Sequence, residues 1–145
     1  MTTVATDGKS MAGDSQCGNP TIHCEVRKIQ RAKDGALLGI CGQAFDLAGF
    51  LLWYECGMSG EPNVSADFEG LILLPSGVAI CVDEKGRKFE HAVPAAVGSG
   101  ASVAYGAMDH GATPTEAVAI AIKRDAGSGG PVQTEFLKPV LEAVA

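Results

Sequence analysis

Long apolar runs, clusters of basic residues and CxxC pairs are all absent from this 145-residue sequence. No run approaches the ~18 apolar residues of a membrane span, and residues 1–20 alternate between polar and apolar types without the apolar core of a signal peptide. The 11 lysine and arginine residues are scattered among 17 acidic ones, a net charge of -6 that argues against nucleic acid or an anionic membrane as partner. We therefore expect a soluble, cytoplasmic protein.

The cysteines are odd in number and have none of the spacings typical of zinc or redox sites. They are Cys17, Cys24, Cys41, Cys56 and Cys81. Reduced, mostly buried thiols are therefore expected, and no metal centre, because a site built from Cys17, His23 and Cys24 fits no standard ligand pattern. Aromatic residues are few, at 6%, but a hydrophobic content of 46% suits one domain with its own core, which we place at residues 2–145.

The N-terminus carries a candidate catalytic group. If Met1 is removed, Thr2 has both a hydroxyl nucleophile and a free α-amine, which titrates at ~7.7 to 8.0 and can accept a proton near neutral pH. Nucleophile and base then belong to one residue. Many chains begin Met-Thr, so an ordinary N-terminus is the alternative, and the rest of the sequence has to decide.

The chain reads as strands, then helices, then a final strand. Strands are expected at 3–6, 11–12, 26–31, 36–41, 70–74, 78–82, 88–92 and 132–137, separated by turn signals such as Asp7-Gly8. Helices are expected at 46–57, from residue 101 to about 110, and from 114 to about 125. The last helix has the clearest start, because Thr113, Pro114 and Glu116 match an N-cap, a first-turn proline and a reciprocal capping residue.

Two polar residues could assist Thr2. Asp14 ends the first expected hairpin, so its carboxylate is expected about one strand away from the N-terminus. Alternation places Lys28 on the same strand face as Val26, where an inward lysine needs a partner such as Asp14 and would favour the alkoxide of Thr2. The alternative is a surface lysine on an edge strand, and spacing alone favours it because lysine is rarely buried.

The Gly98-Ser99-Gly100 loop opens a helix, where free backbone N–H groups favour an anion such as phosphate. However, Val103 occupies the third glycine position of a dinucleotide fingerprint, and no GK[ST] follows, so neither nucleotide motif is met. Glycines for a tight turn with serine as a cap explain the loop's shape equally well. No cofactor is expected.

In order along the chain, these segments resemble those of a proteasome β-type subunit. They are the threonine after Met1, Gly13-Asp14, Lys28, Gly42 within Ile-Cys-Gly-Gln-Ala-Phe-Asp, Val97-Gly98-Ser99-Gly100, and Arg124-Asp125-Ala126-Gly127-Ser128-Gly129-Gly130. The N-terminus and Gly13-Asp14-Ser15-Gln16 are most similar to HslV, the bacterial proteasome-like peptidase. The resemblance spans almost the whole chain. It implies an α+β fold, the four-layer αββα sandwich of N-terminal nucleophile (Ntn) hydrolases, with two antiparallel sheets covered by helices.

The resemblance also implies roles for individual residues. Thr2 matches the nucleophile, Lys28 the lysine that activates its hydroxyl, and Asp14 the carboxylate that holds this lysine. The N–H of Gly42 matches the oxyanion-hole donor. Attack on an amide would then give an acyl-enzyme ester, which water hydrolyses.

Further matches concern the α-amine and the substrate. Ser99, Asp125 and Ser128 match the polar cluster that orients the amine and its water. Ile40, with Ala44 beside it, matches the base of the substrate side-chain pocket and implies a preference for apolar side chains.

One departure concerns the helical layer next to the first helix. The family's second helix is missing there and is replaced by residues 57–69, which leaves ring stoichiometry and docking to a partner ATPase unfoldase open. The protein is expected to be a homo-oligomer that assembles partly through this first helix, because the helix is apolar on both sides. Its sheet-facing stripe is Leu47, Phe50, Leu51, Tyr54 and Met58, and its opposite side carries Leu52, Trp53 and Cys56.

The sequence thus predicts a ring-like threonine peptidase acting on peptides or unfolded proteins. Two alternatives stay open: a small-molecule amidase of the same superfamily, and a catalytically silent proteasome-like scaffold.

Overall fold

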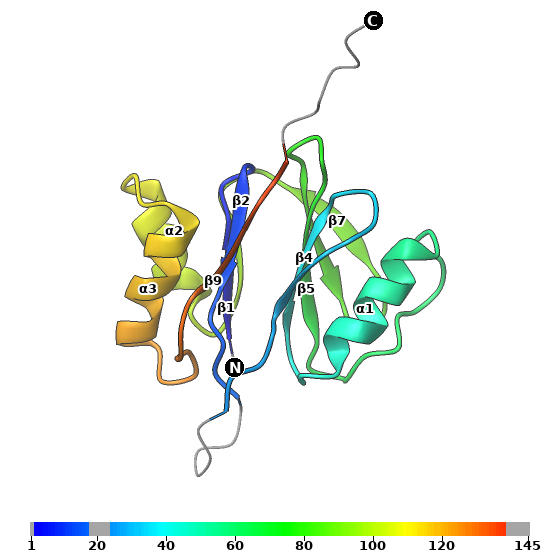
Figure 1. The fold of residues 1–145 in the computed structure, drawn as a ribbon, viewed down its shortest axis with the longest axis horizontal. Coiled ribbons are helices and arrows are strands. Elements are labelled where there is room, and N and C mark those ends of the chain that lie inside the picture. The colour runs from blue at the N-terminus through cyan, green and yellow to red at the C-terminus, as the bar shows by residue number, and fades with distance from the viewer. Residues whose placement is uncertain (1, 18–23, 139–145) are drawn as a thin grey trace, which may run out of the picture.

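The computed structural model describes residues 2–17 and 24–138, and Met1 and His23 lie outside these ranges. Two antiparallel sheets lie face to face, with strand orders β8-β1-β2-β9 and β3-β4-β5-β6-β7. Helices α2 and α3 cover the outer face of the first sheet and α1 covers the second, so the layers run α-β-β-α across Figure 1. The predicted α+β sandwich is confirmed. The elements are β1 (Thr3–Thr6), β2 (Ser10–Gly13), β3 (Ile29–Arg31), β4 (Leu37–Cys41), α1 (Asp46–Glu55), β5 (Glu69–Leu73), β6 (Ala79–Asp83), β7 (Lys88–His91), β8 (Ala95–Gly98), α2 (Ala101–Asp109), α3 (Pro114–Arg124) and β9 (Gln133–Phe136).

The expected first hairpin is formed by β1 and β2. Gly8 adopts a φ of +91° in the turn, where a side chain would be strained, and Asp7 Oδ1 accepts the N–H of Ser10 at 2.9 Å. Val4 pairs with Gly13, so Thr2, two residues before Val4, and Asp14, directly after Gly13, emerge at the same end of the sheet.

The main core lies between the two sheets. Val4 and Met11 of the first sheet pack against Ile29, Leu37 and Leu71 of the second, and all are at most 1% exposed. At Gly39 in β4, a Cβ would lie 2.5 Å from Val4 Cγ1, so the missing side chain lets β1 and β4 approach closely. This approach brings the N-terminal end of β1 near the end of β4.

Two strands differ from the sequence prediction. Residues 26–28 lie outside β3, which begins at Ile29, and β8 was not predicted at all. Its sequence, Ala-Ala-Val-Gly, has little intrinsic strand preference, and it is held instead by pairing along all of β1, from Thr3 opposite Gly98 to Thr6 opposite Ala95.

The predicted start of α3 is confirmed in detail. Thr113 Oγ1 accepts the N–H of Glu116 at 3.2 Å, and Glu116 Oε1 accepts the N–H of Thr113 at 3.0 Å, which completes a capping box before Pro114. Across the described part of the chain, none of the helices has the length and apolar character needed to cross a membrane.

Around α1, the structure exposes fewer apolar side chains than the sequence predicts. The segment between α1 and β5 contains no helix, as expected, but it packs against α1, and a Cβ at Gly49 would collide with Asn63 O. Trp53, which the sequence placed on the outward side, is only 6% exposed and donates its indole N–H to Gly60 O at 3.0 Å. The outward apolar surface is therefore smaller than predicted and centres on Leu52 and Phe45, which are 66% and 68% exposed.

Candidate active site

The side chains of Thr2, Lys28 and Asp14 meet in the interior, at the N-terminal end of β1. Lys28 Nζ donates to Thr2 Oγ1 at 3.0 Å and to both oxygens of Asp14, at 3.0 and 3.1 Å. Thr2 is 1% exposed, and the Lys28 and Asp14 side chains are 6% and 0% exposed. The ammonium therefore lies between a hydroxyl and a carboxylate, away from water, where its field acts strongly on both.

The carboxylate of Asp14 is fixed by the backbone as well as by Lys28. It accepts hydrogen bonds from the N–H groups of Thr3 at 3.1 Å, Gln16 at 3.3 Å and Gly129 at 3.0 Å. Charge-assisted bonds of this kind are among the stronger hydrogen bonds in proteins. The position of Asp14, and through it that of Lys28 Nζ, is thus set by three separate segments of the chain.

Asp14 and Lys28 lie on two segments that run antiparallel. Val26 N–H donates to Ser15 O at 3.0 Å, and the N–H of Cys17 donates to Cys24 O at 3.2 Å. This pairing holds the Cα atoms of Cys17 and Cys24 at 5.3 Å, within disulfide range, and the two cysteines form a disulfide. The prediction of reduced thiols is therefore wrong for this pair, because a seven-residue separation in sequence gave no sign that the segments pair.

A second polar group surrounds the Thr2 nitrogen. Thr2 N donates to Ser99 Oγ at 3.3 Å, and Ser99 and Ser128 each donate a hydroxyl to Asp125 Oδ2 at 2.6 Å. Partial burial raises the pKa of Asp125, but hydrogen bonds from Ser128, Ser99 and the backbone of Gly127 lower it, and the net result is a pKa below the usual carboxyl value. Ser128 also shares a hydrogen bond of 2.7 Å with Thr3 Oγ1. Ser99 thus bonds toward Thr2 and Asp125, and α2 has no side-chain cap.

Gly42 borders the same space as Thr2. Its φ is +138°, and a Cβ there would lie 2.6 Å from Asp46 Oδ2, so glycine alone suits this turn. A cavity of about 340 Å³ opens beside Thr2. It is lined by Thr2, Cys41, Gly42, Asp67, Glu69, Gly98 and Ser99. Burial, and next the charge of Glu69, raise the pKa of the Cys41 thiol, which therefore stays neutral.

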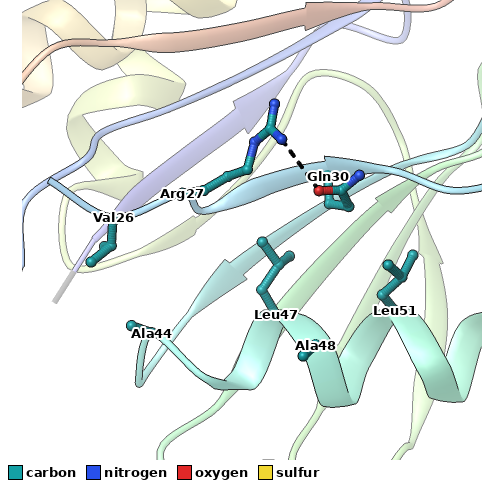
Figure 2. A pocket seen from close by; sticks show the side chains of 7 residues that line it. All are labelled: Val26, Arg27, Gln30, Ala44, Leu47, Ala48 and Leu51. Atoms are coloured by element: carbon teal, nitrogen blue, oxygen red, sulfur yellow. Dashed lines mark hydrogen bonds between the residues drawn. The ribbon is translucent and has the colours of Figure 1, made fainter.

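An apolar groove of about 460 Å³ lies between α1 and the segment that leads into β3 (Figure 2). Leu47 and Leu51 point from α1 toward that segment, and Ala44 stands at the end near Val26. The lining residues are Val26, Arg27, Gln30, Ala44, Leu47, Ala48 and Leu51. Ala44 therefore lines this groove, whereas Ile40, at 2% exposed, packs into the core beneath α1 and lines neither space.

Comparison with known proteins gave matches among solved structures only; no family model and no curated protein matches the chain. The protein named BPH from Thiobacillus denitrificans matches with a TM-score of 0.69 and 21% identity, over 95% of this chain and 98% of that one. The same protein in complex with epoxomicin matches with a TM-score of 0.66 and 20% identity, over 95% and 99%.

The third match is eukaryotic HslV from Trypanosoma brucei, with a TM-score of 0.66 and 16% identity, over 92% of this chain and 97% of that one. This chain shares the fold of HslV. At such low identities the likeness establishes the HslV-like fold, which the sequence resemblance had implied, and the roles of individual residues have to be argued from the site.

Two residues at the site were not anticipated from the sequence. Thr3 binds Asp14 through its N–H and Ser128 through its hydroxyl. Asp46, 0% exposed, accepts the N–H of Gln43 at 2.9 Å and so holds the turn that carries Gly42. The signal for Asp46 was its place at the start of α1, where an acidic residue stabilises the helix and does not by itself indicate a site.

Proposed function

We propose that this chain is an N-terminal threonine peptidase that becomes active when Met1 is removed. The observation that carries the proposal is the 3.0 Å contact between Lys28 Nζ and Thr2 Oγ1, both buried, with Asp14 behind the lysine. A buried ammonium beside a hydroxyl favours the alkoxide, and an inert surface residue would not need this arrangement.

In the proposed reaction, Thr2 Oγ1 attacks the carbonyl carbon of an amide while its proton passes to the free α-amine of the same residue. The C–N bond then breaks, the amine proton goes to the leaving nitrogen, and an ester links the acyl group to Thr2. A water molecule, deprotonated by the same amine, cleaves the ester and restores the hydroxyl. Ser99, Asp125 and Ser128 hold the amine in place through the chain of hydrogen bonds at the Thr2 nitrogen.

Gly42 is the proposed oxyanion donor, since it borders the same cavity as Thr2. A backbone N–H cannot be removed by substitution, but any side chain at Gly42 would collide with Asp46 and move the donor. Loss of one oxyanion donor typically raises the barrier by ~2.7 to 4 kcal/mol.

The groove of Figure 2 is the proposed site for the substrate's side chain on the acyl side. It begins at Val26, two residues before Lys28, and its α1 wall is entirely aliphatic, so we expect cleavage after apolar residues. Ala44 keeps its predicted role in this proposal. Ile40 contributes indirectly, because its N–H donates to the carbonyl of Lys28 at 3.0 Å.

Self-assembly is part of the proposal. Phe45, the residue before α1, and Leu52, seven residues further along, are both large, apolar and strongly exposed. Contact with another copy would cover them, and a ring would restrict access to peptides and unfolded proteins. An ATPase unfoldase is a further proposed partner.

Epoxomicin provides a direct test, because its epoxyketone can react with a hydroxyl and a free amine on the same residue. The intact mass of the purified protein, measured with and without epoxomicin, should show loss of Met1 and then gain of one whole inhibitor. A protein that has lost Met1 and gains no mass would refute the threonine mechanism.

Two variants serve as controls for this test. Thr2→Ala keeps the amine and loses the hydroxyl, so it should fold, gain no mass and cleave no peptide. A chain with lysine inserted before Thr2 keeps the hydroxyl but has no free amine on it, and it should also be folded and inactive. Peptides with apolar residues before the cleaved bond should be substrates; turnover of small amides alone would favour the amidase.

A further inference from the structure

We propose that Gln133 is a positioning residue that sets the location of Lys28 relative to Thr2. Its side-chain amide bridges two backbone groups of the segment before β3: Oε1 accepts the N–H of Lys28 at 2.9 Å, and Nε2 donates to Val26 O at 2.7 Å. Gln133 belongs to β9 in the opposite sheet, 105 residues away from Lys28. The inference rests on the proposed function, since it concerns the lysine of that mechanism.

The backbone at Lys28 depends on such contacts because it lies outside the regular sheet. β3 begins one residue later, so the strand ladder of the second sheet does not include Lys28. Its N–H bonds to Gln133 and its carbonyl to the N–H of Ile40 in β4, so one residue from each sheet holds it. The primary amide of Gln133 can bind both the N–H of Lys28 and the carbonyl of Val26, because it presents an acceptor and a donor side by side, as a neighbouring strand would.

The position of Gln133 is itself tied to Asp14. In the pairing of β2 with β9, Gln133 lies opposite Gly13, and Gly13 directly precedes Asp14 in the sequence. The strand that holds the backbone of Lys28 is therefore paired with the strand that leads to its carboxylate partner. The backbone of Lys28 binds Gln133 and its ammonium binds Asp14, so both ends of this residue are held by the same part of the first sheet.

Without Gln133, the backbone of residues 26–28 would lose two of its hydrogen bonds to the first sheet and keep the one from Val26 N–H to Ser15 O, and the ammonium would shift relative to Thr2 Oγ1. Displacements of about 1 Å at a reacting group can lower rates by roughly 100-fold. We therefore expect Gln133→Leu, which keeps the volume and loses both hydrogen bonds, to lower the maximal rate of epoxomicin labelling by about 10- to 100-fold.

Glu135 offers a matched control on the same strand. It is two residues further along β9, so it lies on the same face, and it joins the two sheets by accepting from Arg31 at 3.1 Å without contacting Lys28. Glu135→Leu also removes contacts between the sheets, and it should leave the labelling rate within about twofold of the native value, because its partly exposed ion pairs with Arg31 and Arg27 contribute little.

The experiment measures labelling by epoxomicin over a range of inhibitor concentrations, together with the urea midpoint, for the native protein and both variants. We expect Gln133→Leu to lower the rate at saturating inhibitor, with little change in the half-saturating concentration and complete final labelling. A purely structural role would lower the folded, labelled fraction and leave the rate of the folded molecules unchanged.

The outcomes separate the two proposals. Absence of labelling in the native protein would refute the proposed function. Normal labelling in the native protein with an unchanged saturating rate in Gln133→Leu would overturn the role of Gln133 alone, as would equal losses in Gln133→Leu and Glu135→Leu.

Discussion

Removing either member of the Asp14–Lys28 pair should destabilise the protein, but by different amounts. Asp14→Ala leaves the buried ammonium with Thr2 Oγ1 as its remaining partner and takes the acceptor away from the N–H groups of Thr3, Gln16 and Gly129. Breaking a buried ion pair in this way typically costs about 3 to 5 kcal/mol of unfolding free energy.

Lys28→Met should be milder. The carboxylate of Asp14 keeps its three backbone donors, and the methionine fills much of the lysine's volume, so the loss is essentially that of the charged hydrogen bond, about 1.5 to 3 kcal/mol. We therefore expect Asp14→Ala to lose roughly 1 to 2 kcal/mol more than Lys28→Met, although both should lose peptidase activity.

The assay is urea unfolding at pH 7 and at one protein concentration, followed by the fluorescence of Trp53, the single tryptophan, which is buried. Arg27→Ala is the control, because its side chain is 63% exposed and should change the unfolding free energy by less than about 0.5 kcal/mol. An equal or larger loss from Lys28→Met would show that the backbone donors do not support the carboxylate as argued.

Two further predictions concern pH and assembly. The value of kcat/KM should rise with pH as the α-amine of Thr2 loses its proton at ~7.7 to 8.0. Because the pKa of Asp125 is lowered, its carboxylate is charged throughout that range and favours the ammonium, so Asp125→Asn should move the midpoint of the pH profile down; an unchanged or higher midpoint would contradict the network. Leu52→Glu places a charge on the proposed contact between copies and should reduce the assembly measured by sedimentation velocity. A native protein that is monomeric at micromolar concentration would contradict the proposed self-assembly.

Local signals in the sequence determined much of the fold. The Asp7-Gly8 turn and the capping residues around Pro114 act within a few residues, so their structural outcome could be read from sequence alone and is confirmed. Strand β8 could not be found in this way. Its alanines and glycine have no strong preference, and only pairing with β1 makes them a strand.

In the candidate site, too, the sequence predicted some features and the tertiary structure decided others. Thr2, Asp14 and Lys28 were candidates from their own chemistry and positions, and the resemblance implied their roles, but spacing alone favoured an exposed Lys28. Burial of the lysine depends on the close approach of the two sheets at Gly39 and on hydrogen bonds with distant segments, from Gly129 N–H to Asp14 and from Lys28 N–H to Gln133 Oε1.

Substrate and surface features belonged almost wholly to the tertiary structure. Sequence placed Ile40 at the base of the substrate pocket, yet the packing of α1 buries it and leaves Ala44 at the groove. The same packing turned Trp53 inward, because residues 57–68 cover a helix face that a periodic pattern can only call apolar. The sequence determines which side chains are apolar enough to be buried. Which element covers them depends on contacts with residues far away in the sequence, and a local pattern does not contain that information.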